Sequence, residues 1–386
     1  MNPFETPERR ALRETVHRFV QRDVLPYQDG WERAGELPRS LHARAGELGL
    51  IGLAYPESVG GGGGSAIDAV ILAEALHCAG GAGGLFASLF TSGISLPHLV
   101  AAGDQTQLDR WVRPTIAGSL IGSLAITEPD GGSDVAGLRT TATPCNHDGA
   151  ACYLVNGAKT YITSGVRADF VVTAVRTGGA GAHGISLLVV EKGMPGFTVS
   201  RKLEKMGWLC SDTAELSYVD VHVPAANLVG AAGSGFAQIA QNFVSERIGL
   251  AVQAYSSAQR CLDVSVAWCR LRETFGRPLI SRAPVQNTLA EMARRIEVAR
   301  VYTRSVAARA AEGEGGLVNE ACFAKNTAVR AGMWVVEQAV QLHGGMGYMR
   351  ESEVERQYRD MRILGIGGGT TEILTGLSAK LLGYTR

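Results

Sequence analysis

The hydrophobic pattern of this chain changes twice, and each change separates a helical region from a strand-rich one. Up to about residue 120, apolar residues recur at helical spacing, as in the stripe of Val16, Phe19 and Val20. Short apolar runs separated by Gly, Asn and Asp turns follow, and they are typical of strands. Helical spacing returns from Ser234, which can cap a long helix. The pattern predicts an α+β protein with a helical domain at 1–120, an antiparallel β-domain at 121–232 and a helical domain at 233–386.

Composition excludes several classes of function. The formal net charge is zero and the pI is about 7.1, so the chain lacks the basic surface of a nucleic-acid-binding protein. No stretch approaches a membrane span of about 20 apolar residues. The seven cysteines are scattered and never in CxxC spacing, so we expect buried thiols of a reducing cytosol and neither disulfides nor a metal site. The composition therefore predicts a cytoplasmic protein with no membrane span and no nucleic-acid partner.

The segment ITEPDGGSDVAGLRT, at 126–140, leaves an apolar run and turns through proline and two glycines. Proline fixes one backbone dihedral and glycine adopts conformations that a side chain forbids, so the turn exposes backbone N–H groups and the hydroxyls of Thr127 and Ser133. Such a surface suits a flat ligand with polar edges. A turn of this composition is also often no more than a turn.

Four further segments appear in a fixed order with this turn: KTYITSG at 159–165, RETFGRP at 272–278, QLHGGMGY at 341–348 and GIGGGTTEI at 365–373. As an ordered set they resemble the acyl-CoA dehydrogenase family of FAD-dependent enzymes, over essentially the whole chain. The resemblance implies an N-terminal helical domain, a middle β-domain and a C-terminal four-helix bundle, with FAD between the β-domain and the bundle.

The resemblance also implies a reaction, the α,β-dehydrogenation of an acyl-CoA thioester to the trans-2-enoyl-CoA. A carboxylate removes the α-proton while the β-hydrogen leaves as hydride to flavin N5. In many members the carboxylate lies in the C-terminal glycine loop, but the corresponding residue here is Gly368. The catalytic base must therefore come from another part of the chain.

Glu246 is the candidate for this base. At 100° per residue it falls on one helical stripe with Ile239, Phe243 and Leu250, where a carboxylate is costly unless it is paired or functional. The alternative is an ion pair with an arginine, although the adjacent Arg247 points about 100° away on the same helix. Isovaleryl- and long-chain-type members of the family carry their base on this helix and have glycine in the loop, so the resemblance favours Glu246 as the base.

The resemblance assigns substrate contacts to three residues. The N–H of Gly368, with a ribityl hydroxyl of the flavin, is expected to polarise the thioester carbonyl. Ser133 and Arg247 are expected to contact the CoA part, and a salt bridge within the bundle is the alternative for Arg247. The floor of the acyl pocket is expected to include Leu85, Phe86, Phe90 and Leu96. The open space at Gly368 gives a weak preference for branched or longer acyl chains.

FAD contacts are implied at positions in all five motifs and at Gln286. Tyr161 and Thr163, two apart on one face of a strand, are expected to flank the isoalloxazine, and Gln341 and Gly345 to reach the flavin of a neighbouring subunit. Glu372 lies in a first helical turn, where a glutamate is also ordinary helix chemistry. The full set is Ile126, Thr127, Ser133, Tyr161, Thr163, Arg272, Thr274, Phe275, Gln286, Gln341, Gly345, Thr370 and Glu372.

The resemblance further implies a homotetramer that passes electrons to an electron-transfer flavoprotein. Two alternatives share the fold. One is an acyl-CoA oxidase-like enzyme, which passes electrons to oxygen. The other is a noncatalytic, flavin-bound binding protein, for example one that binds nucleic acid, and the neutral charge of the chain counts against it.

Overall fold

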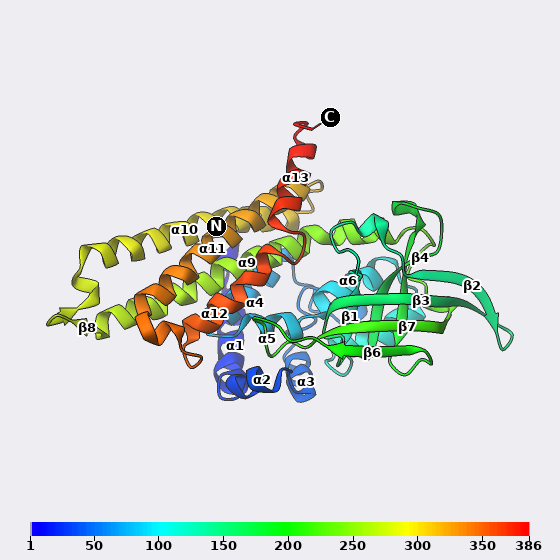
Figure 1. The fold of residues 1–386 in the computed structure, drawn as a ribbon, viewed down its shortest axis with the longest axis horizontal. Helices are drawn as coiled ribbons and strands as arrows, with labels where there is room; N and C mark the ends of the chain where they lie inside the picture. Colours follow the sequence, from blue (N-terminus) through cyan, green and yellow to red (C-terminus); the bar gives the residue numbers. More distant parts are fainter. Residues whose placement is uncertain (1, 386) are drawn as a thin grey trace.

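The computed structural model describes residues 2–385 and divides into three parts that follow one another along the chain (Figure 1). The β-domain lies at one end of the molecule and the long helices of the C-terminal part extend to the other end (Figure 1). The N-terminal helices pack beside both. The site described below lies where these parts meet.

The N-terminal part is helical, as its apolar spacing predicts. Val16, Phe19 and Val20 are all buried, so the stripe seen in the sequence is a core face. A capping box formed by Ser65 and Asp68 starts the fourth helix directly after the glycine run at 60–64. The helices are α1 (Pro7–Phe19), α2 (Gln28–Ala34), α3 (Arg39–Glu47), α4 (Ala66–Cys78), α5 (Gly83–Leu89), α6 (Ser92–Ala102), α7 (Gln105–Gln107) and α8 (Arg113–Ile116).

One stretch of this part corrects the expectation that nothing in the chain approaches a membrane span. Gly83–Ala102 is long enough and, with a mean hydropathy of 1.5, apolar enough to cross a membrane by length and composition. Half of it is buried inside the fold, and it forms two helices, α5 and α6, that end and begin around Phe90 and Thr91. These features are those of core helices in a folded domain.

The middle part is a seven-stranded sheet in the order β1-β4-β2-β3-β7-β6, with β5 paired to β4. Most neighbours are antiparallel, as predicted, but β1 runs parallel to β4, so the sheet is mixed. β4 and β5 are buried along almost their whole length, which explains their continuous apolar runs. The strands are β1 (Gly122–Ala125), β2 (Thr141–His147), β3 (Ala150–Thr163), β4 (Phe170–Arg176), β5 (Ile185–Glu191), β6 (Phe197–Lys202) and β7 (Thr213–Pro224).

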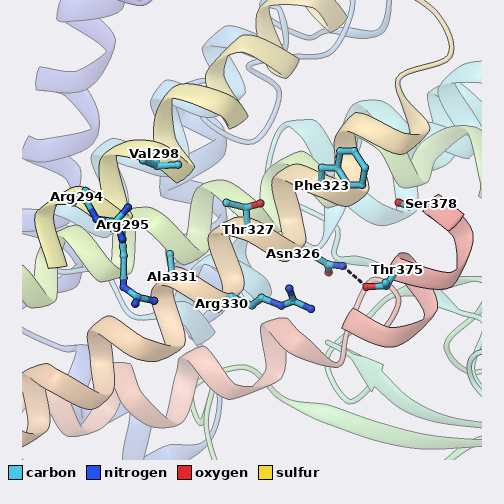
Figure 2. A pocket seen from close by; sticks show the side chains of 10 residues that line it. All are labelled: Arg294, Arg295, Val298, Phe323, Asn326, Thr327, Arg330, Ala331, Thr375 and Ser378. Atoms are coloured by element: carbon cyan, nitrogen blue, oxygen red, sulfur yellow. Dashed lines mark hydrogen bonds between the residues drawn. The ribbon is translucent and has the colours of Figure 1, made fainter. Parts of the chain in front are cut away.

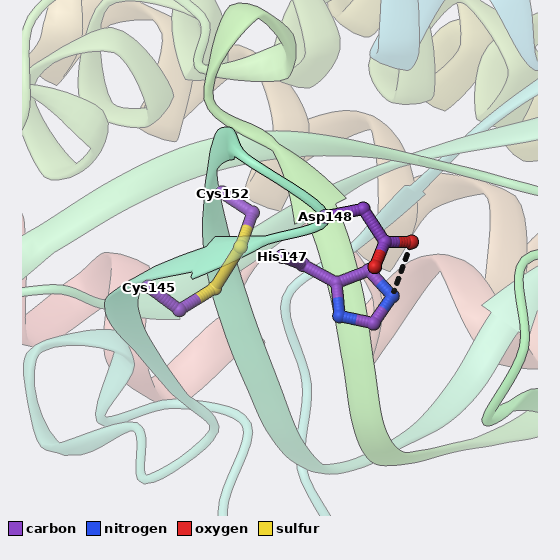
Figure 3. The surroundings of a disulfide bond; sticks show 4 residues. All are labelled: Cys145, His147, Asp148 and Cys152. Carbon is purple, nitrogen blue, oxygen red and sulfur yellow. Dashed lines mark ion pairs between the residues drawn. A yellow bond between two sulfur atoms is a disulfide. The ribbon is translucent and has the colours of Figure 1, made fainter.

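A disulfide joins Cys145 to Cys152 across the hairpin of β2 and β3 (Figure 3). The two residues are directly opposite each other in the register of the strands. The expectation that every cysteine is a free thiol is wrong here, because strand pairing brings together two residues whose spacing in the sequence carries no signal. Of the five free cysteines, Cys78 is exposed and the other four are buried, as predicted.

The C-terminal part is built on α9, a helix of 37 residues. It starts directly after Ser234 as predicted, but the hydroxyl of Ser234 donates to the carbonyl of Ala231 and does not cap the helix. A short helix that the sequence analysis did not identify, α12, follows α11. The elements are α9 (Gly235–Leu271), a small hairpin of β8 (Glu273–Thr274) and β9 (Arg277–Pro278), α10 (Ala283–Ala311), α11 (Val318–His343), α12 (Glu353–Arg362) and α13 (Thr371–Leu381).

A buried carboxylate ties the three parts together. Asp360 on α12 accepts hydrogen bonds from the backbone N–H groups of Gly83 in α5, at 3.1 Å, and of Trp208 in the β-domain, at 2.6 Å. Burial raises the pKa of Asp360 to about 6. Because one residue from each part takes part in this contact, it fixes how the three parts meet beside Gln253 of α9, whose amide donates to the carbonyl of Gly83.

Candidate active site

Glu246 and Gly368 lie next to each other, one on a bundle helix and the other in a loop beside it. Glu246 lies on α9, and Gly368 lies in the loop between α12 and α13. A Cβ built on Gly368 would lie 3.1 Å from Oε1 of Glu246 and 2.4 Å from Cδ1 of Leu250. The φ of Gly368 is +64°, a left-handed conformation that favours glycine. The structure therefore brings together the two positions that the sequence analysis connected, and the glycine is what leaves room for the glutamate.

The carboxylate of Glu246 has no partner. Within residues 2–385 it forms neither a hydrogen bond nor an ion pair with another side chain or with the backbone, so the ion-pair alternative finds no support. Burial raises the pKa of Glu246 above its ordinary value, while the charges of Lys325 and Arg247 act in the opposite direction. A half-buried carboxylate with a raised pKa and unused acceptor oxygens is suited to accept a proton.

The loop opposite Glu246 offers an unused donor. No acceptor in the described part of the chain pairs with the backbone N–H of Gly368. The residues on both sides are held: the ammonium of Lys325 donates to the carbonyls of Gly367 and, at 2.6 Å, of Gly369. Thr370 then caps α13 by accepting from the N–H of Ile373 at 3.2 Å. A free N–H in a fixed loop next to a free carboxylate is the arrangement that polarises a carbonyl and deprotonates the neighbouring carbon.

Lys325 is a residue that the sequence analysis missed. It is only 1% exposed, and its neighbours on the same face of α11, Ala321 and Ala328, are fully buried. A lysine in an apolar stripe is the same kind of signal that identified Glu246, so the sequence could have revealed it.

The two residues expected to bind CoA occupy different surroundings. Arg247 is 6% exposed, lies over the ring of Phe243 with its guanidinium carbon 5.0 Å from the ring centroid, and has a buried Nε without a partner. It forms no salt bridge within the described residues. Ser133 is exposed in its turn. The side chain of Arg247 therefore faces the interior near Glu246, whereas Ser133 faces outward from the β-domain.

The first and second motifs lie side by side. The N–H of Thr160 donates to the carbonyl of Thr127 at 2.9 Å, which joins the turn to β3. Lys159 is fully buried, and its ammonium donates to the carbonyl of Ile126 at 3.0 Å and to Glu128 at 2.8 Å. This buried pair, which the sequence analysis did not identify, fixes the backbone from which Ile126 and Thr127 project.

Tyr161 presents a bare aromatic ring at the same edge. It is 69% exposed, Ile162 is buried and Thr163 is half-buried, so Tyr161 and Thr163 both project away from the core. Tyr161 has a φ of +60° and lies at an irregularity in the pairing of β3 with β7. An exposed flat ring beside free hydroxyls fits the edge and face of an isoalloxazine. These residues are therefore compatible with FAD at this edge.

Six of the remaining flavin candidates lie at the far end of the bundle, whereas Thr370 and Glu372 lie at the start of α13, directly after the Gly368 loop. Thr274 and Phe275 lie in the β8–β9 hairpin, and Arg272 lies directly before it; Figure 1 places this hairpin at the end opposite the β-domain. The hairpin follows α9, and at 1.5 Å per residue it lies roughly 40 Å along the helix from Glu246. Phe275 is 97% exposed. One chain therefore does not bring this hairpin to a flavin that lies beside its own Glu246.

The segment around Gln341 shares this far end. The ring of His343 stacks on Trp268 with centroids 5.1 Å apart, and Nε1 of Trp268 donates to the carbonyl of Leu342 at 3.2 Å. Gln341 and Gly345 are both exposed there. Gln286 is exposed near the start of α10 and donates to the carbonyl of Ile280 at 2.9 Å. From the sequence, only Gln341 and Gly345 are expected to contact the flavin of a neighbouring subunit. The structure places the β8–β9 hairpin beside these two residues.

A cavity of about 420 Å³ opens between α10, α11 and α13 (Figure 2). It is lined by Arg294, Arg295, Asn326, Arg330 and Thr375, among others, and by neither Glu246 nor Gly368. Asn326 donates to the hydroxyl of Thr375 across it at 3.2 Å. The cavity lies on α11 beside Lys325 but is separate from the space between Glu246 and Gly368.

Three family models match the chain in sequence order. They describe the N-terminal, middle and C-terminal domains of acyl-CoA dehydrogenase and match residues 6–119, 123–221 and 233–383. The chain belongs to the acyl-CoA dehydrogenase family. Proteins of this family are FAD-dependent flavoenzymes, which agrees with the exposed ring and hydroxyls at the edge of the β-domain.

Individual relatives are similar over nearly the whole chain. The mitochondrial long-chain specific acyl-CoA dehydrogenase of Rattus norvegicus is 36% identical, over 97% of this chain and 86% of the relative. The mitochondrial isovaleryl-CoA dehydrogenase of Pongo abelii is 33% identical, over 95% and 86%. The crystal structure of a Mycobacterium smegmatis protein assigned as an acyl-CoA dehydrogenase is 66% identical and superposes with a TM-score of 0.97, covering 99% of this chain and all of that one. The chain is thus an acyl-CoA dehydrogenase in its fold and general reaction class.

Proposed function

We propose that this protein dehydrogenates an acyl-CoA thioester to the trans-2-enoyl-CoA, with Glu246 as the catalytic base. The observation that carries the proposal is the unpaired carboxylate of Glu246 opposite the side-chain-free Gly368. The family usually has its base at the position of Gly368, and the two positions face each other, so a base at 246 reaches the same space from the other side.

The chain supplies the groups for proton removal. The α-proton of a thioester is only weakly acidic, so the carbonyl must be polarised by a fixed donor while the base acts. The free N–H of Gly368 supports this role, and Glu246 takes the proton on one of its unpaired oxygens. Burial raises the pKa of Glu246, which makes the carboxylate a stronger base. FAD, when bound, supplies the acceptor for the β-hydride at N5.

The absence of a side chain at Gly368 gives a weak preference for branched or longer chains. Gly368 has no side chain to occupy space near the α and β carbons. Leu85 and Leu96, two of the residues expected at the pocket floor, are fully buried, and the rings of Phe86 and Phe90 pack 5.1 Å apart. We assign Ser133 and Arg247 to the CoA part, as the resemblance implies.

We assign FAD binding to two sets of residues on two different chains. Ile126, Thr127, Tyr161 and Thr163 lie together at the edge of the β-domain near the start of α9. The far-end residues, roughly 40 Å away along the helix, then serve the flavin of a neighbouring copy. Their exposure, with Phe275 nearly fully bare, supports this assignment. This arrangement favours an oligomer such as the expected homotetramer.

The electron acceptor and the cellular location extend the proposal. We expect electrons to pass to an electron-transfer flavoprotein, as is general in the family. A cytoplasmic location, which the cysteine pattern favours, stays a prediction. The disulfide between Cys145 and Cys152 counts against the reducing environment on which that prediction rests.

The test is anaerobic bleaching of the flavin band by a panel of acyl-CoAs. Glu246→Gln keeps the size of the side chain and removes its basicity, so we expect bleaching to slow by about 10²- to 10⁴-fold while acyl-CoA still perturbs the flavin spectrum. Glu337→Gln, at an exposed position on α11, is the matched control and should behave as wild type.

Three other outcomes of this test would each support a different interpretation. Equal bleaching rates for Glu246→Gln and wild type would make Glu246 a structural residue. If no acyl-CoA bleached wild type, the dehydrogenase assignment would fail, and salt-sensitive retention on DNA would then test the binding-protein alternative. Fast reoxidation of the bleached flavin by oxygen would favour the oxidase-like alternative.

A further inference from the structure

Lys325 is the charged residue that holds the glycine loop. Its ammonium donates to the carbonyls of Gly367 and Gly369, one on each side of Gly368. Its Nζ lies 3.7 Å from the point that a Cβ on Gly368 would occupy, and Oε1 of Glu246 lies 3.1 Å from the same point. Lysine is almost never buried without a reason, and Lys325 is 1% exposed.

The hydrogen bond from Lys325 to the carbonyl of Gly367 acts on the peptide group that also contains the N–H of Gly368. The carbonyl of Gly367 and the N–H of Gly368 belong to one peptide unit, which is trans, because no described peptide bond is cis. In a trans peptide the C=O and N–H bonds point in opposite directions, so an ammonium on the carbonyl turns the N–H away from α11. A cation on the carbonyl oxygen also polarises the unit and strengthens the N–H as a donor.

The same ammonium lies near the base. No direct ion pair joins Lys325 to Glu246, but the charge of Lys325 counteracts the effect of burial on the carboxyl. The groups around this pair are Arg247, on the helix of Glu246, and the thiol of Cys322, on the helix of Lys325. Lys325 is thus the charge on α11 that acts on both the donor and the base.

We propose that Lys325 is a positioning residue for the dehydrogenation: it aims and polarises the Gly367–Gly368 peptide at the thioester carbonyl and places a positive charge beside Glu246. The proposal rests on the proposed function, since both groups act on the substrate of that reaction. The hydrogen bonds of Lys325 go to the carbonyls of the loop. Its effect passes through the loop and through the charge of Glu246.

The experiment compares wild type with Lys325→Met, which keeps the length of the side chain and removes the charge and the donors. We expect anaerobic bleaching by the best acyl-CoA to slow by about tenfold or more, since loss of one donor to a developing oxyanion costs about 10²- to 10³-fold and Lys325 acts indirectly. The acid limb of the bleaching rate should move to higher pH, because an opposite charge at this range shifts a carboxyl pKa by about 1–3. Lys325→Arg keeps a charge and should leave that limb in place.

A readout that does not depend on turnover is deuterium exchange of the loop amides at 366–370. Exchange should accelerate in Lys325→Met in both the FAD-free and the FAD-bound protein. The matched control is Lys192→Met, because Lys192 is an exposed lysine whose ammonium also donates to a backbone carbonyl, that of Val166 at 3.5 Å. It should change neither the exchange nor the pH profile.

The possible outcomes distinguish a failure of the proposed role of Lys325 from a failure of the proposed function. If wild type bleaches, Glu246→Gln does not, and Lys325→Met shows the rate, pH limb and loop exchange of wild type, the role of Lys325 is wrong and the function stands. If wild type does not bleach with any acyl-CoA, the function itself fails. Should Lys325→Met not fold, Lys325→Gln, whose amide keeps two N–H donors, tests the charge alone, and an unmoved acid limb would then overturn the proposal.

Discussion

Replacing Gly368 by alanine tests the geometry of the site more directly than any change to the base. Two costs are expected. Holding alanine at the φ of +64° costs about 1–2 kcal/mol, because a Cβ crowds the backbone in the left-handed region. The new methyl would also meet Leu250 at 2.4 Å, and overpacking of a well-packed region costs about 1–3 kcal/mol. Together we expect Gly368→Ala to lower the stability of the bundle by roughly 2–5 kcal/mol.

The effect on activity should be larger than the loss of stability alone produces. The methyl would lie 3.1 Å from Oε1 of Glu246, closer than a carbon and an oxygen ordinarily approach, so the carboxylate must move from its present position. A displacement of about 1 Å in a reacting group costs up to about 10²-fold in rate. Anaerobic bleaching of the folded, FAD-loaded variant measures this term.

Gly367→Ala is the matched control in the same loop. A Cβ there would meet only the carbonyl of Ile363, at 3.7 Å, and the residue has no left-handed φ. Alanine should therefore leave stability unchanged or raise it by up to about 1 kcal/mol, as glycine replacement does at compatible positions. If urea unfolding and bleaching show the two alanine variants to be alike, the geometric reasoning is refuted.

The substitution Leu250→Ala separates the cost of overpacking from the cost of backbone strain at position 368. Combined with Gly368→Ala it removes the 2.4 Å contact but leaves the backbone strain. The double variant should therefore be less destabilised than the sum of the two single variants by about 1–3 kcal/mol. Strict additivity would mean that the methyl introduced at position 368 does not touch Leu250.

Two further predictions concern the buried pair under the first motif. Lys159→Met leaves Glu128 buried without its charged partner, which lowers the stability by about 3–5 kcal/mol. The change also removes the hydrogen bond to the carbonyl of Ile126. We therefore expect a lower FAD content after gel filtration and weaker binding of FAD, measured as its Kd. Burial alone would raise the pKa of Glu128, but Lys159 and the backbone N–H groups of Thr140 and Arg139 together lower it to about 2. The stabilisation is therefore present above about pH 4.5 and is lost as the pH falls toward 2. The difference in Tm between wild type and Glu128→Gln should therefore shrink over that pH range, and a constant difference would contradict the assignment.

Much of the architecture follows from the sequence because long periodic segments leave few alternatives. The stripe containing Val16 and the 37-residue helix after Ser234 both form as their spacing predicts. Glu246 can be identified from the sequence because a carboxylate among apolar neighbours is costly unless it is paired or functional. The resemblance of the chain to one subset of the family gives this carboxylate a function. The comparisons confirm the family, and the placement of Glu246 opposite Gly368 agrees with its predicted role.

What the sequence did not reveal depends on contacts between distant segments. The disulfide joins residues that strand pairing places opposite each other. The parallel pairing of β1 with β4 joins segments that are not consecutive along the chain. The roles of Lys159 and Lys325 depend on backbone carbonyls of another segment, which no side-chain pattern encodes.

The contact between positions 246 and 368 also limits how such an enzyme can change over evolutionary time. A lineage that moves its base from the loop to α9 must pass either through a protein with no carboxylate in the site or through one with two. The first has lost its base, and the second forces a Cβ to within 2.4 Å of Leu250. A smaller residue at 250 would open the second route before either carboxylate changed. The side chain at 250, which takes no part in the chemistry, would then determine the order in which the two mutations can be tolerated.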